Sequence, residues 1–475
     1  MRTGELSWWW RSLGGPPPAR APLPGPTEAD VAIVGAGFTG LWTAFYLKRA
    51  DPSLRVVVLE REHAGFGASG RNGGWVSGFF SGPRRTYERG NAAGARLAHH
   101  TGTQADGSGG GGYAALQREM FATVGEIAQV ASELGIDADL LHSGLLTVAL
   151  NAAQATRLRE SVAAARARGL TEEDLRELGV EELALRVRVA GARGASFSPH
   201  VARVNPLKLL IGLAAAVEQL GVPIYEHTPV SAIARGAAHT PMGEVRARWV
   251  VRACEGYTAA LAGMHRELVP INSSMIVTEP LDAHAWEQIG WSGCELMDDG
   301  AHVYVYLQRT ADGRIAIGGR GVPYRFGSRT DGRGQTAPST VSALHAKLLE
   351  MFPAAAGVGI EHAWSGVLGV ARDWCVSVGA DRDNGLAWAG GYVGEGVAAS
   401  NLAARTLRDL VLGERTQLTE LPWVGHHAHR WEPEPLRWMG IRGVYALYRG
   451  ADRGERRSGR PSCLGQLVDL VSGRH

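Results

Sequence analysis

Three glycines and one acid near the start of the chain have the spacing of a dinucleotide-binding site. Gly35, Gly37 and Gly40 lie between an apolar segment and a helical pattern, and Glu60 ends the next apolar segment. The first glycine permits a tight turn, the second lets a pyrophosphate approach the backbone, and the third lets the helix pack closely on the strand. The acid can accept hydrogen bonds from ribose hydroxyls and would repel a 2′-phosphate. The spacing therefore favours FAD or NAD over NADP.

A strand, helix, strand unit over residues 30–62 must position these groups. Residues 31–34 are apolar, a helical pattern follows the glycines, and a second apolar segment leads to Glu60. The N-terminal end of such a helix carries a partial positive charge that faces the phosphates. Because each element stands in its proper order, we favour a nucleotide site over a purely structural glycine turn.

Two further glycine-rich segments lie at residues 65–75 and 390–397. The later segment precedes a helical run at residues 398–412, so its backbone could approach a planar ring while helix N–H groups stabilise negative charge. The alternative is a plain turn between a strand and a helix. The residues alone support the two interpretations equally.

Residues 30–47 and 65–75 together resemble the D-amino-acid oxidase-like (DAO) superfamily of FAD-dependent oxidoreductases, especially its γ-glutamylputrescine oxidase-type branch. The resemblance continues in order through residues 199–230, 249–261 and 385–407. It implies that FAD is the cofactor and that the segment at 390–397 contacts the flavin. The FAD-binding residues expected from the glycine pattern and the resemblance are Gly35, Gly37, Phe38, Thr39, Gly40, Glu60, Arg61, Ala68, Ser69, Asn72, Gly73, Gly74, Val230, Gly391, Gly394, Gly396 and Val397.

The same resemblance implies an α/β fold with an α+β second domain. We expect a discontinuous Rossmann-like FAD-binding domain and a substrate domain built on an antiparallel sheet, followed by a C-terminal tail. The expected ranges are 1–100, 198–268 and 360–425 for the first domain, 101–197 and 269–359 for the second, and 426–475 for the tail.

Local patterns predict two elements of this fold directly. Val305 and Leu307 alternate with tyrosines ahead of an Asp-Gly pair at 312–313, which predicts a half-buried antiparallel hairpin. Asn205 followed by Pro206 predicts the start of a helix. The register of the hairpin cannot be predicted, so the residues that share a face with its tyrosines stay open.

The resemblance implies oxidation of a primary or secondary amine or an amino acid. A hydride passes to flavin N5, the imine hydrolyses, and oxygen reoxidises the flavin. A desolvated aromatic pocket suits this chemistry because the amine must react without its extra proton. Core packing for the aromatic residues and a solvated position for the arginine are the alternatives. Our candidate catalytic residues are Arg320, as a cation for oxygen or a substrate carboxylate, with Tyr304 and Trp364; His200, Arg203 and Arg372 are further candidates for the cation.

Two departures from related sarcosine oxidases bear on the chemistry. Residues 365–371 lack the cysteine that attaches their flavin, so we expect non-covalent FAD. The chain's lysines, at 48, 208 and 347, offer no evident counterpart of their oxygen-activating lysine. A FAD-dependent amine dehydrogenase that uses another acceptor therefore remains an alternative, as does a non-catalytic FAD-binding protein.

The C-terminal region raises two other possibilities. His426, His427 and His429 form a run without an acid or cysteine at a supporting spacing, so we expect no metal site. Residues 432–460 are rich in arginine and aromatic residues. We favour a helix packed on the body of the protein over a membrane-surface or partner-docking helix.

Composition is that of a large enzyme with a small-molecule substrate. The 475 residues carry a formal net charge of +2, which argues against nucleic acid as a partner. Four scattered cysteines form no CxxC pair and favour a reducing, cytoplasmic location. The sequence contains no apolar run of about 20 residues, so we predict no membrane-spanning helix. Trp8, Trp9 and Trp10 are expected either to anchor the N-terminal arm or to lie in a loose terminus.

Overall fold

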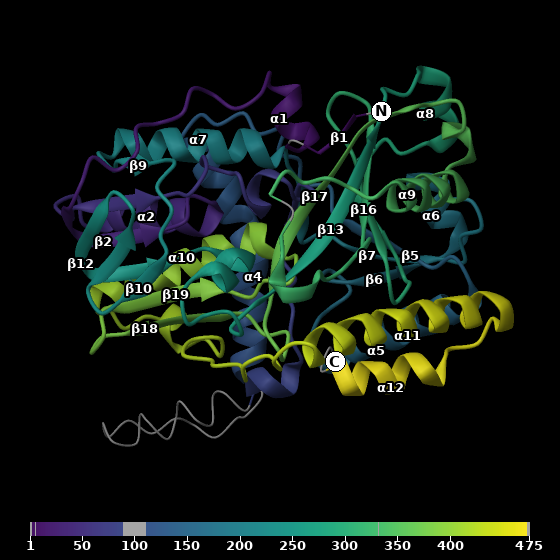
Figure 1. Cartoon of the computed structure of the whole chain (residues 1–475). Helices are drawn as coiled ribbons and strands as arrows, with labels where there is room; N and C mark the ends of the chain where they lie inside the picture. Colours follow the sequence, from purple (N-terminus) through teal and green to yellow (C-terminus); the bar gives the residue numbers. More distant parts are fainter. Residues whose placement is uncertain (1, 5, 89–110, 331, 473–475) are drawn as a thin grey trace.

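The computed structural model describes residues 2–4, 6–88, 111–330 and 332–472, and it contains two large sheets side by side (Figure 1). The predicted boundary at residue 100 lies outside these residues. Helices cover the eight-stranded sheet, and the nine-stranded sheet stands beside it. This arrangement is the expected α/β fold with an α+β second domain.

The eight-stranded sheet holds the predicted dinucleotide unit. Strands β12, β2, β3 and β9 are parallel neighbours in that order, and β19 pairs with the other edge of β12. Its strands are β2 (Thr27–Val34), β3 (Val56–Leu59), β9 (Ile224–Tyr225), β10 (Ala232–Ala234), β11 (Ala237–Thr240), β12 (Gly243–Arg252), β18 (Ser377–Asp381) and β19 (Leu386–Gly390). The helices packed around it are α2 (Phe38–Ala50), α4 (Gly111–Glu133), α7 (Pro206–Gln219) and α10 (Gly396–Leu412).

The second sheet has the order β1-β17-β13-β16-β15-β14-β5-β7-β6 and is mainly antiparallel. Its strands are β1 (Arg2–Thr3), β5 (Leu145–Val148), β6 (Arg176–Leu178), β7 (Ala195–Ser198), β13 (Val269–Thr278), β14 (Leu296–Asp299), β15 (Val305–Arg309), β16 (Ile315–Gly319) and β17 (Ile360–Val370). Nearby helices are α5 (Ala152–Ala167), α6 (Val180–Arg186), α8 (Ala283–Ile289) and α9 (Pro338–Met351). A separate ribbon joins β4 (Trp75–Ser77) to β8 (Val201–Arg203).

The strand partition bears on the expected domain ranges, which remain a prediction. β17 starts at Ile360, in the range expected for the FAD-binding domain, yet all its partners belong to the nine-stranded sheet. Its buried, largely apolar strand pairs along the full length of β13. The chain therefore passes back to the eight-stranded sheet at β18.

Both locally predicted elements are confirmed. β15 and β16 form the antiparallel hairpin, with Val305 and Leu307 in the core. The Asn205 side chain accepts hydrogen bonds from the N–H groups of Leu207 and Lys208, and Pro206 is the first residue of α7. Local polarity and capping chemistry decided these elements.

The two ends of the described chain pack on the body. Trp8, Trp9 and Trp10 lie buried in α1 (Trp8–Ser12), so the anchoring alternative for the arm is the one observed. At the other end, α11 (Leu436–Ser458) and α12 (Cys463–Ser472) form a hairpin beside the nine-stranded sheet (Figure 1). Among the described residues, no helix combines the length and apolar character that a membrane span requires.

Candidate functional site

The glycines at the end of β2 are fixed by close backbone contacts. A Cβ on Gly35 would lie 2.7 Å from the carbonyl oxygen of Ala253, and Gly35 has a φ of 110°. On Gly40, a Cβ would lie 1.9 Å from the carbonyl oxygen of Gly35. A Cβ on Gly37 would lie 2.9 Å from Ser69 Oγ, a side-chain atom at the N-terminus of the helix. Gly35 and Gly40 therefore leave no room for a side chain, whereas Gly37 keeps the backbone accessible beside Ser69.

The N-terminus of α2 is left open for an anion. Its N-cap, Gly37, supplies no side-chain cap, and the first turn contains no acid. The N–H of Phe38 donates to Ser69 Oγ at 2.9 Å, which ties the helix to the segment 65–75. Uncapped N–H groups and the helix dipole attract phosphate. These residues fit a pyrophosphate.

Glu60 is placed to bind a ribose. One carboxylate oxygen accepts the N–H of Ala36 at 2.8 Å, and the other accepts the N–H of Glu62 at 3.0 Å. Burial raises the pKa of the Glu60 carboxyl, although these two hydrogen bonds oppose the rise. Each oxygen keeps a further lone pair for a ribose hydroxyl.

One elongated cavity joins these groups to the segment 390–397. Most of the expected FAD-binding residues line it: Gly35, Gly37, Phe38, Thr39, Glu60, Arg61, Ala68, Ser69, Asn72, Val230, Gly394, Gly396 and Val397. Gly40, Gly73, Gly74 and Gly391 are not among the lining residues. Lining residues that sequence reasoning missed include Phe66, Cys254, Glu255, Tyr257, Leu368, Tyr392 and Ser400.

Gly73 and Gly74 bring the nine-stranded sheet close to the cofactor segment. A Cβ on Gly73 would lie 2.9 Å from the Tyr306 ring. Gly74 has a φ of 70°, and its N–H donates to the Asn72 side chain at 2.8 Å. The side-chain amide of Gln308 donates to the carbonyl oxygen of Gly73. The two glycines therefore let the sheet of the second domain lie directly over the cofactor segment.

Glu255 holds the segment at 390–397 in place. Its carboxylate accepts the N–H groups of Gly391 at 2.9 Å, Tyr392 at 3.2 Å and Gly369 at 3.2 Å. Burial raises the pKa of Glu255 to about 7, despite these three donors. Beyond the segment, α10 begins at Gly396 without a side-chain cap, so its N–H groups face the cavity. Such donors suit negative charge on a reduced flavin.

The strand register settles which residues share a face with the hairpin tyrosines. Tyr306 pairs with Asp298 on β14 and with Gly318 on β16. Gly318 pairs with Met275, and Met275 pairs with Trp364. Residues paired across neighbouring strands point to the same side of a sheet. These paired residues therefore lie on the side of the sheet on which Tyr306 contacts Gly73 of the cofactor segment.

A second cavity of about 240 Å³ lies beside this face. Arg320 and Tyr304, both predicted from the sequence, line it together. One guanidinium nitrogen of Arg320 donates to the carbonyl oxygen of Val393 at 3.4 Å, and Nη1 is buried without a hydrogen-bond partner among the described residues. The full lining is Phe80, Ser81, Gly82, His302, Val303, Tyr304, Arg320, Trp374, Val393 and Tyr445.

Glu395 is a charged residue of this region that sequence reasoning missed. Burial raises the pKa of its carboxyl, whereas a hydrogen bond with Ser77 and the charge of Arg320 lower it. Glu395, itself part of the segment 390–397, therefore lies within electrostatic range of Arg320. A sequence signal existed, because an acid stands inside the glycine-rich segment.

The remaining sequence candidates lie outside the second cavity. Trp364 is fully buried and donates its indole N–H to the carbonyl oxygen of Arg71 at 2.9 Å, which is the packing role left open above. His200 pairs with Asp174 at 2.8 Å, and Arg372 pairs with Glu432 at 3.0 Å. Arg203 donates to the carbonyl oxygen of Arg309 at 3.1 Å.

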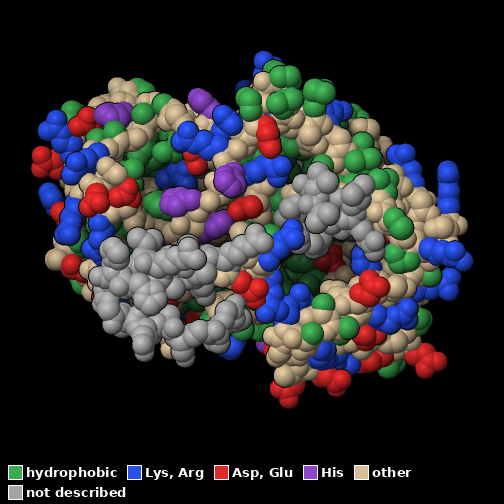
Figure 2. All heavy atoms as spheres, turned by 90° about the horizontal axis from the view of Figure 1, so that it is seen from below, with side chains coloured by type: hydrophobic (Ala, Val, Ile, Leu, Met, Phe, Trp, Pro, Cys, Tyr) green, Lys and Arg blue, Asp and Glu red, His purple; other side chains and the backbone are tan. Residues whose placement is uncertain are grey.

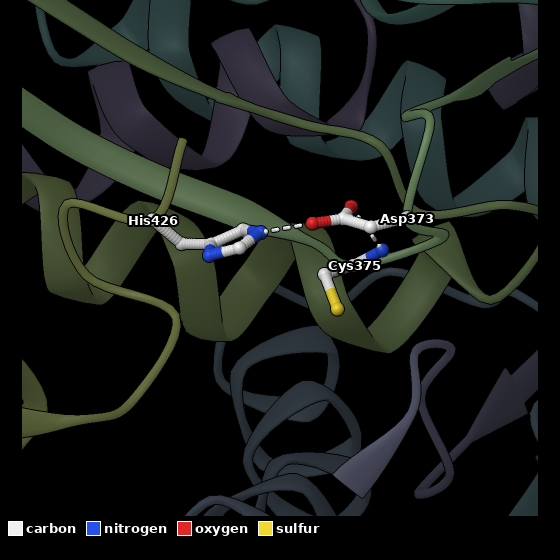
Figure 3. Close-up of side chains that lie close together, drawn as sticks. All are labelled: Asp373, Cys375 and His426. Atoms are coloured by element: carbon white, nitrogen blue, oxygen red, sulfur yellow. Dashed lines mark hydrogen bonds and ion pairs between the residues drawn. The ribbon is translucent and has the colours of Figure 1, made fainter. Parts of the chain in front are cut away.

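His426, the first residue of the histidine run, lies close to an acid and a cysteine that are distant from it in the sequence. Potential ligand atoms of Asp373, Cys375 and His426 lie within 4.8 Å of one another. Asp373 and His426 form an ion pair at 2.7 Å, while the Cys375 thiol points away from it (Figure 3). The expectation of no metal site stays a prediction.

A comparison with protein families decides the classification. The model of the family described as DAO, FAD dependent oxidoreductase, matches residues 30–410. The chain belongs to the DAO family of FAD-dependent oxidoreductases. FAD is therefore the cofactor of this enzyme, and the residues of the cavity beside Gly37, Glu60 and Gly394 fit it.

Similar DAO-family proteins cover most of the chain. Gamma-glutamylputrescine oxidoreductase of Escherichia coli (strain K12) is 29% identical over 413 residues, with 84% of this chain and 87% of that protein aligned. Glycine oxidase of Geobacillus kaustophilus (strain HTA426) is 24% identical over 404 residues, covering 83% and 96% of the two chains.

Solved structures show the same fold. The crystal structure of glycine oxidase from Geobacillus kaustophilus has a TM-score of 0.66 at 22% identity, covering 84% of this chain and 99% of its own. L-proline dehydrogenase from P. horikoshii has a TM-score of 0.65 at 18% identity, covering 84% and 98%. The expected Rossmann-like fold is therefore confirmed.

Proposed function

We propose that this enzyme oxidises a primary or secondary amine or an amino acid, and that its preferred substrates carry a carboxylate. One observation carries the proposal: the buried Arg320 guanidinium lines the second cavity with Nη1 unpaired. Arg320 forms no ion pair with another described residue, although Glu395 lies within electrostatic range, so the site favours a ligand that brings a carboxylate to Nη1. The names of the two aligned relatives, which refer to a glutamylated amine and to glycine, support this choice.

The residues around the second cavity would orient and desolvate the amine. Arg320 holds the carboxylate, and its Val393 contact places that carboxylate beside the flavin segment. The positive charge of Arg320 and the partly buried surroundings of Tyr304 favour the neutral amine over the ammonium form. The flavin, when bound, supplies the two-electron acceptor that converts the C–N bond to an imine, which water then hydrolyses.

Oxygen is the proposed electron acceptor, with a dehydrogenase as the second candidate. No observation within the described residues discriminates between these acceptors, and the non-catalytic alternative would require that no amine reduce the flavin. A small-molecule amine and a dioxygen or quinone-type acceptor are thus the proposed partners. A cytoplasmic location remains a prediction.

Arg320→Met tests the proposal. Under anaerobic conditions, a carboxylate-bearing amine should bleach the wild-type flavin, and the variant should need a concentration roughly 10 to 100 times higher, because a charged hydrogen-bonded contact is lost. An amine without a carboxylate should respond equally in both proteins. Arg372→Met, which removes an ion pair outside the cavity, is the control. An equal response of Arg320→Met and wild type to every substrate would contradict the proposal.

A further inference from the structure

The hairpin of α11 and α12 follows the region that the family model matches, which ends at residue 410. It nevertheless reaches the second cavity, because Tyr445 of α11 is one of the lining residues. The Tyr445 side chain is 9% exposed and makes no hydrogen bond from its hydroxyl to another described residue. It lies close enough to Arg320 to influence the pKa of that arginine.

Two contacts fix α11 against the segments that carry the cavity residues. The Asp452 carboxylate accepts the N–H groups of His302 at 2.9 Å and Val303 at 3.1 Å, immediately before Tyr304. Arg449 donates to the carbonyl oxygen of Gly321 at 2.9 Å, immediately after Arg320. Tyr445, Arg449 and Asp452 are spaced by four and three residues, so they share one face of the helix.

Buried charges strengthen this attachment. Glu455, one turn after Asp452, is 1% exposed and pairs with Arg157 at 2.7 Å and with His302 at 3.1 Å. Burial would raise the pKa of Glu455, but the hydrogen bonds from His302 and Arg157 lower it to about 2. The Glu455 carboxylate therefore stays charged at neutral pH, and its contacts hold the helix on the second domain.

The second helix of the hairpin reaches the same cavity through Trp374. The indole N–H of Trp374 donates to the carbonyl oxygen of Ser472 in α12 at 3.1 Å. Trp374 lines the cavity and has a φ of 64°, a conformation that side chains rarely adopt. The hairpin thus contributes one wall residue directly and holds another.

We infer that the C-terminal hairpin sets substrate specificity and that Tyr445 is its specificity-determining residue. The hydroxyl of Tyr445 and the guanidinium of Arg320 bind one substrate carboxylate together, and the Tyr445 ring limits the body of the amine to what a cavity of about 240 Å³ admits. This inference rests on the proposed function for its substrate class. It assigns a role in recognition to a segment beyond the matched family region.

The outward side of α11 is basic and partly apolar. Its exposed charged residues are Arg442, Arg449, Arg453, Arg456 and Arg457, and its exposed large apolar residues are Leu436, Met439 and Leu447. Basic and hydrophobic side chains are both visible on the face of the molecule seen from below (Figure 2). A basic, apolar surface also suits a membrane, so the internal role of the hairpin rests on the contacts of Tyr445, Asp452 and Glu455.

Point variants of Tyr445 test the inference. Tyr445→Phe should raise KM for carboxylate-bearing amines roughly fivefold at constant kcat, because it removes one hydrogen bond. Tyr445→Ala should shift kcat/KM roughly tenfold toward bulkier amines. Leu447→Ala, an exposed position on the same helix, is the control. FAD content and thermal midpoint, measured for each protein, separate recognition from a loss of folding.

A binding measurement decides the inference without turnover. Carboxylates of increasing size, from acetate to benzoate, are titrated while the flavin absorbance is followed. Tyr445→Ala should weaken acetate and strengthen benzoate relative to Leu447→Ala. Unchanged size preference in folded, FAD-containing Tyr445 variants would overturn the inference, as would the absence of any carboxylate response in wild type. Failure of the proposed function would appear separately, as a wild-type flavin that binds these carboxylates but is reduced by no amine.

Discussion

The carboxylate of Glu255 accepts a hydrogen bond from the N–H of Gly391 at 2.9 Å. Glu255 follows β12 of the eight-stranded sheet, and Gly391 follows β19. Gly391 has a φ of 80°, and a Cβ there would lie 3.0 Å from the carbonyl oxygen of Cys375. One acid therefore fixes the backbone that we propose lies against the flavin.

Replacing Glu255 with alanine should lower both stability and FAD affinity. Three N–H groups, from Gly369, Gly391 and Tyr392, lose their acceptor. We expect a loss of about 3 kcal/mol in the free energy of unfolding, since buried unpaired donors are costly. Urea unfolding and FAD titration measure the two effects. Glu414→Ala, at an exposed position, is the control; equal behaviour of the two variants would refute this role.

Gly37→Leu should yield a protein with little bound FAD. A Cβ at this position meets Ser69 Oγ at 2.9 Å, and a longer side chain enters the space for the pyrophosphate. The ratio of visible flavin absorbance to protein absorbance measures the FAD occupancy. Gly125→Leu places leucine in α4 where a Cβ meets nothing within 4 Å. Full flavin content in folded Gly37→Leu would exclude the assigned pyrophosphate position.

The flavin should leave the protein intact when acid unfolds it. Cys375 is fully buried and does not line the cofactor cavity. Cys254 lines the cavity, but its thiol faces the carbonyl oxygen of Val34 at 3.3 Å, near the predicted ribose site. After acid precipitation, FAD should remain in the supernatant. Flavin fluorescence that migrates with the denatured chain on a gel would show a covalent bond.

Asp298 should make the protein less stable as pH rises. Burial raises the pKa of the Asp298 carboxyl from its ordinary value of 3.8 to about 8. The folded state thus binds more protons than the unfolded state between these values, so stability falls as pH rises through that window. Asp298→Asn should flatten the decrease in the free energy of unfolding with pH. Urea unfolding at a series of pH values from about 5 to about 9 measures this slope. Asp383→Asn, at an exposed position, should keep the wild-type slope; an unchanged slope in Asp298→Asn would exclude this source.

Sequence patterns predicted the parts of the site that depend on neighbours along the chain. Gly35, Gly37 and Gly40 act within one turn, and the alternation around Tyr306 is a property of one hairpin. Glu255 could not be found this way, because its partner Gly391 lies 136 residues away. The contact depends on how β12 and β19 pair, which no local pattern encodes.

The lining of the second cavity was even less predictable from neighbours along the chain. Arg320 and Tyr304 were predicted from one hairpin, but Tyr445 reaches them from a helix near the C-terminus. Residue type alone also left both a packing and a pocket role open for Trp364, whose buried indole donates to the carbonyl oxygen of Arg71. A tryptophan suits a core as well as a pocket, and only tertiary packing distinguishes the two.

Anaerobic mixing of the wild-type enzyme with amines tests the central claim most directly. The panel holds γ-glutamyl amines, N-methyl amino acids, D-amino acids and polyamines, and flavin absorbance is followed before and after air is admitted. We predict that a carboxylate-bearing amine bleaches the flavin, that air restores its colour, and that hydrogen peroxide forms with ammonia or a smaller amine and a carbonyl product. Slow recovery of the flavin absorbance in air, together with fast recovery on adding a quinone, would indicate the dehydrogenase. A flavin that no amine in the panel bleaches would contradict the account.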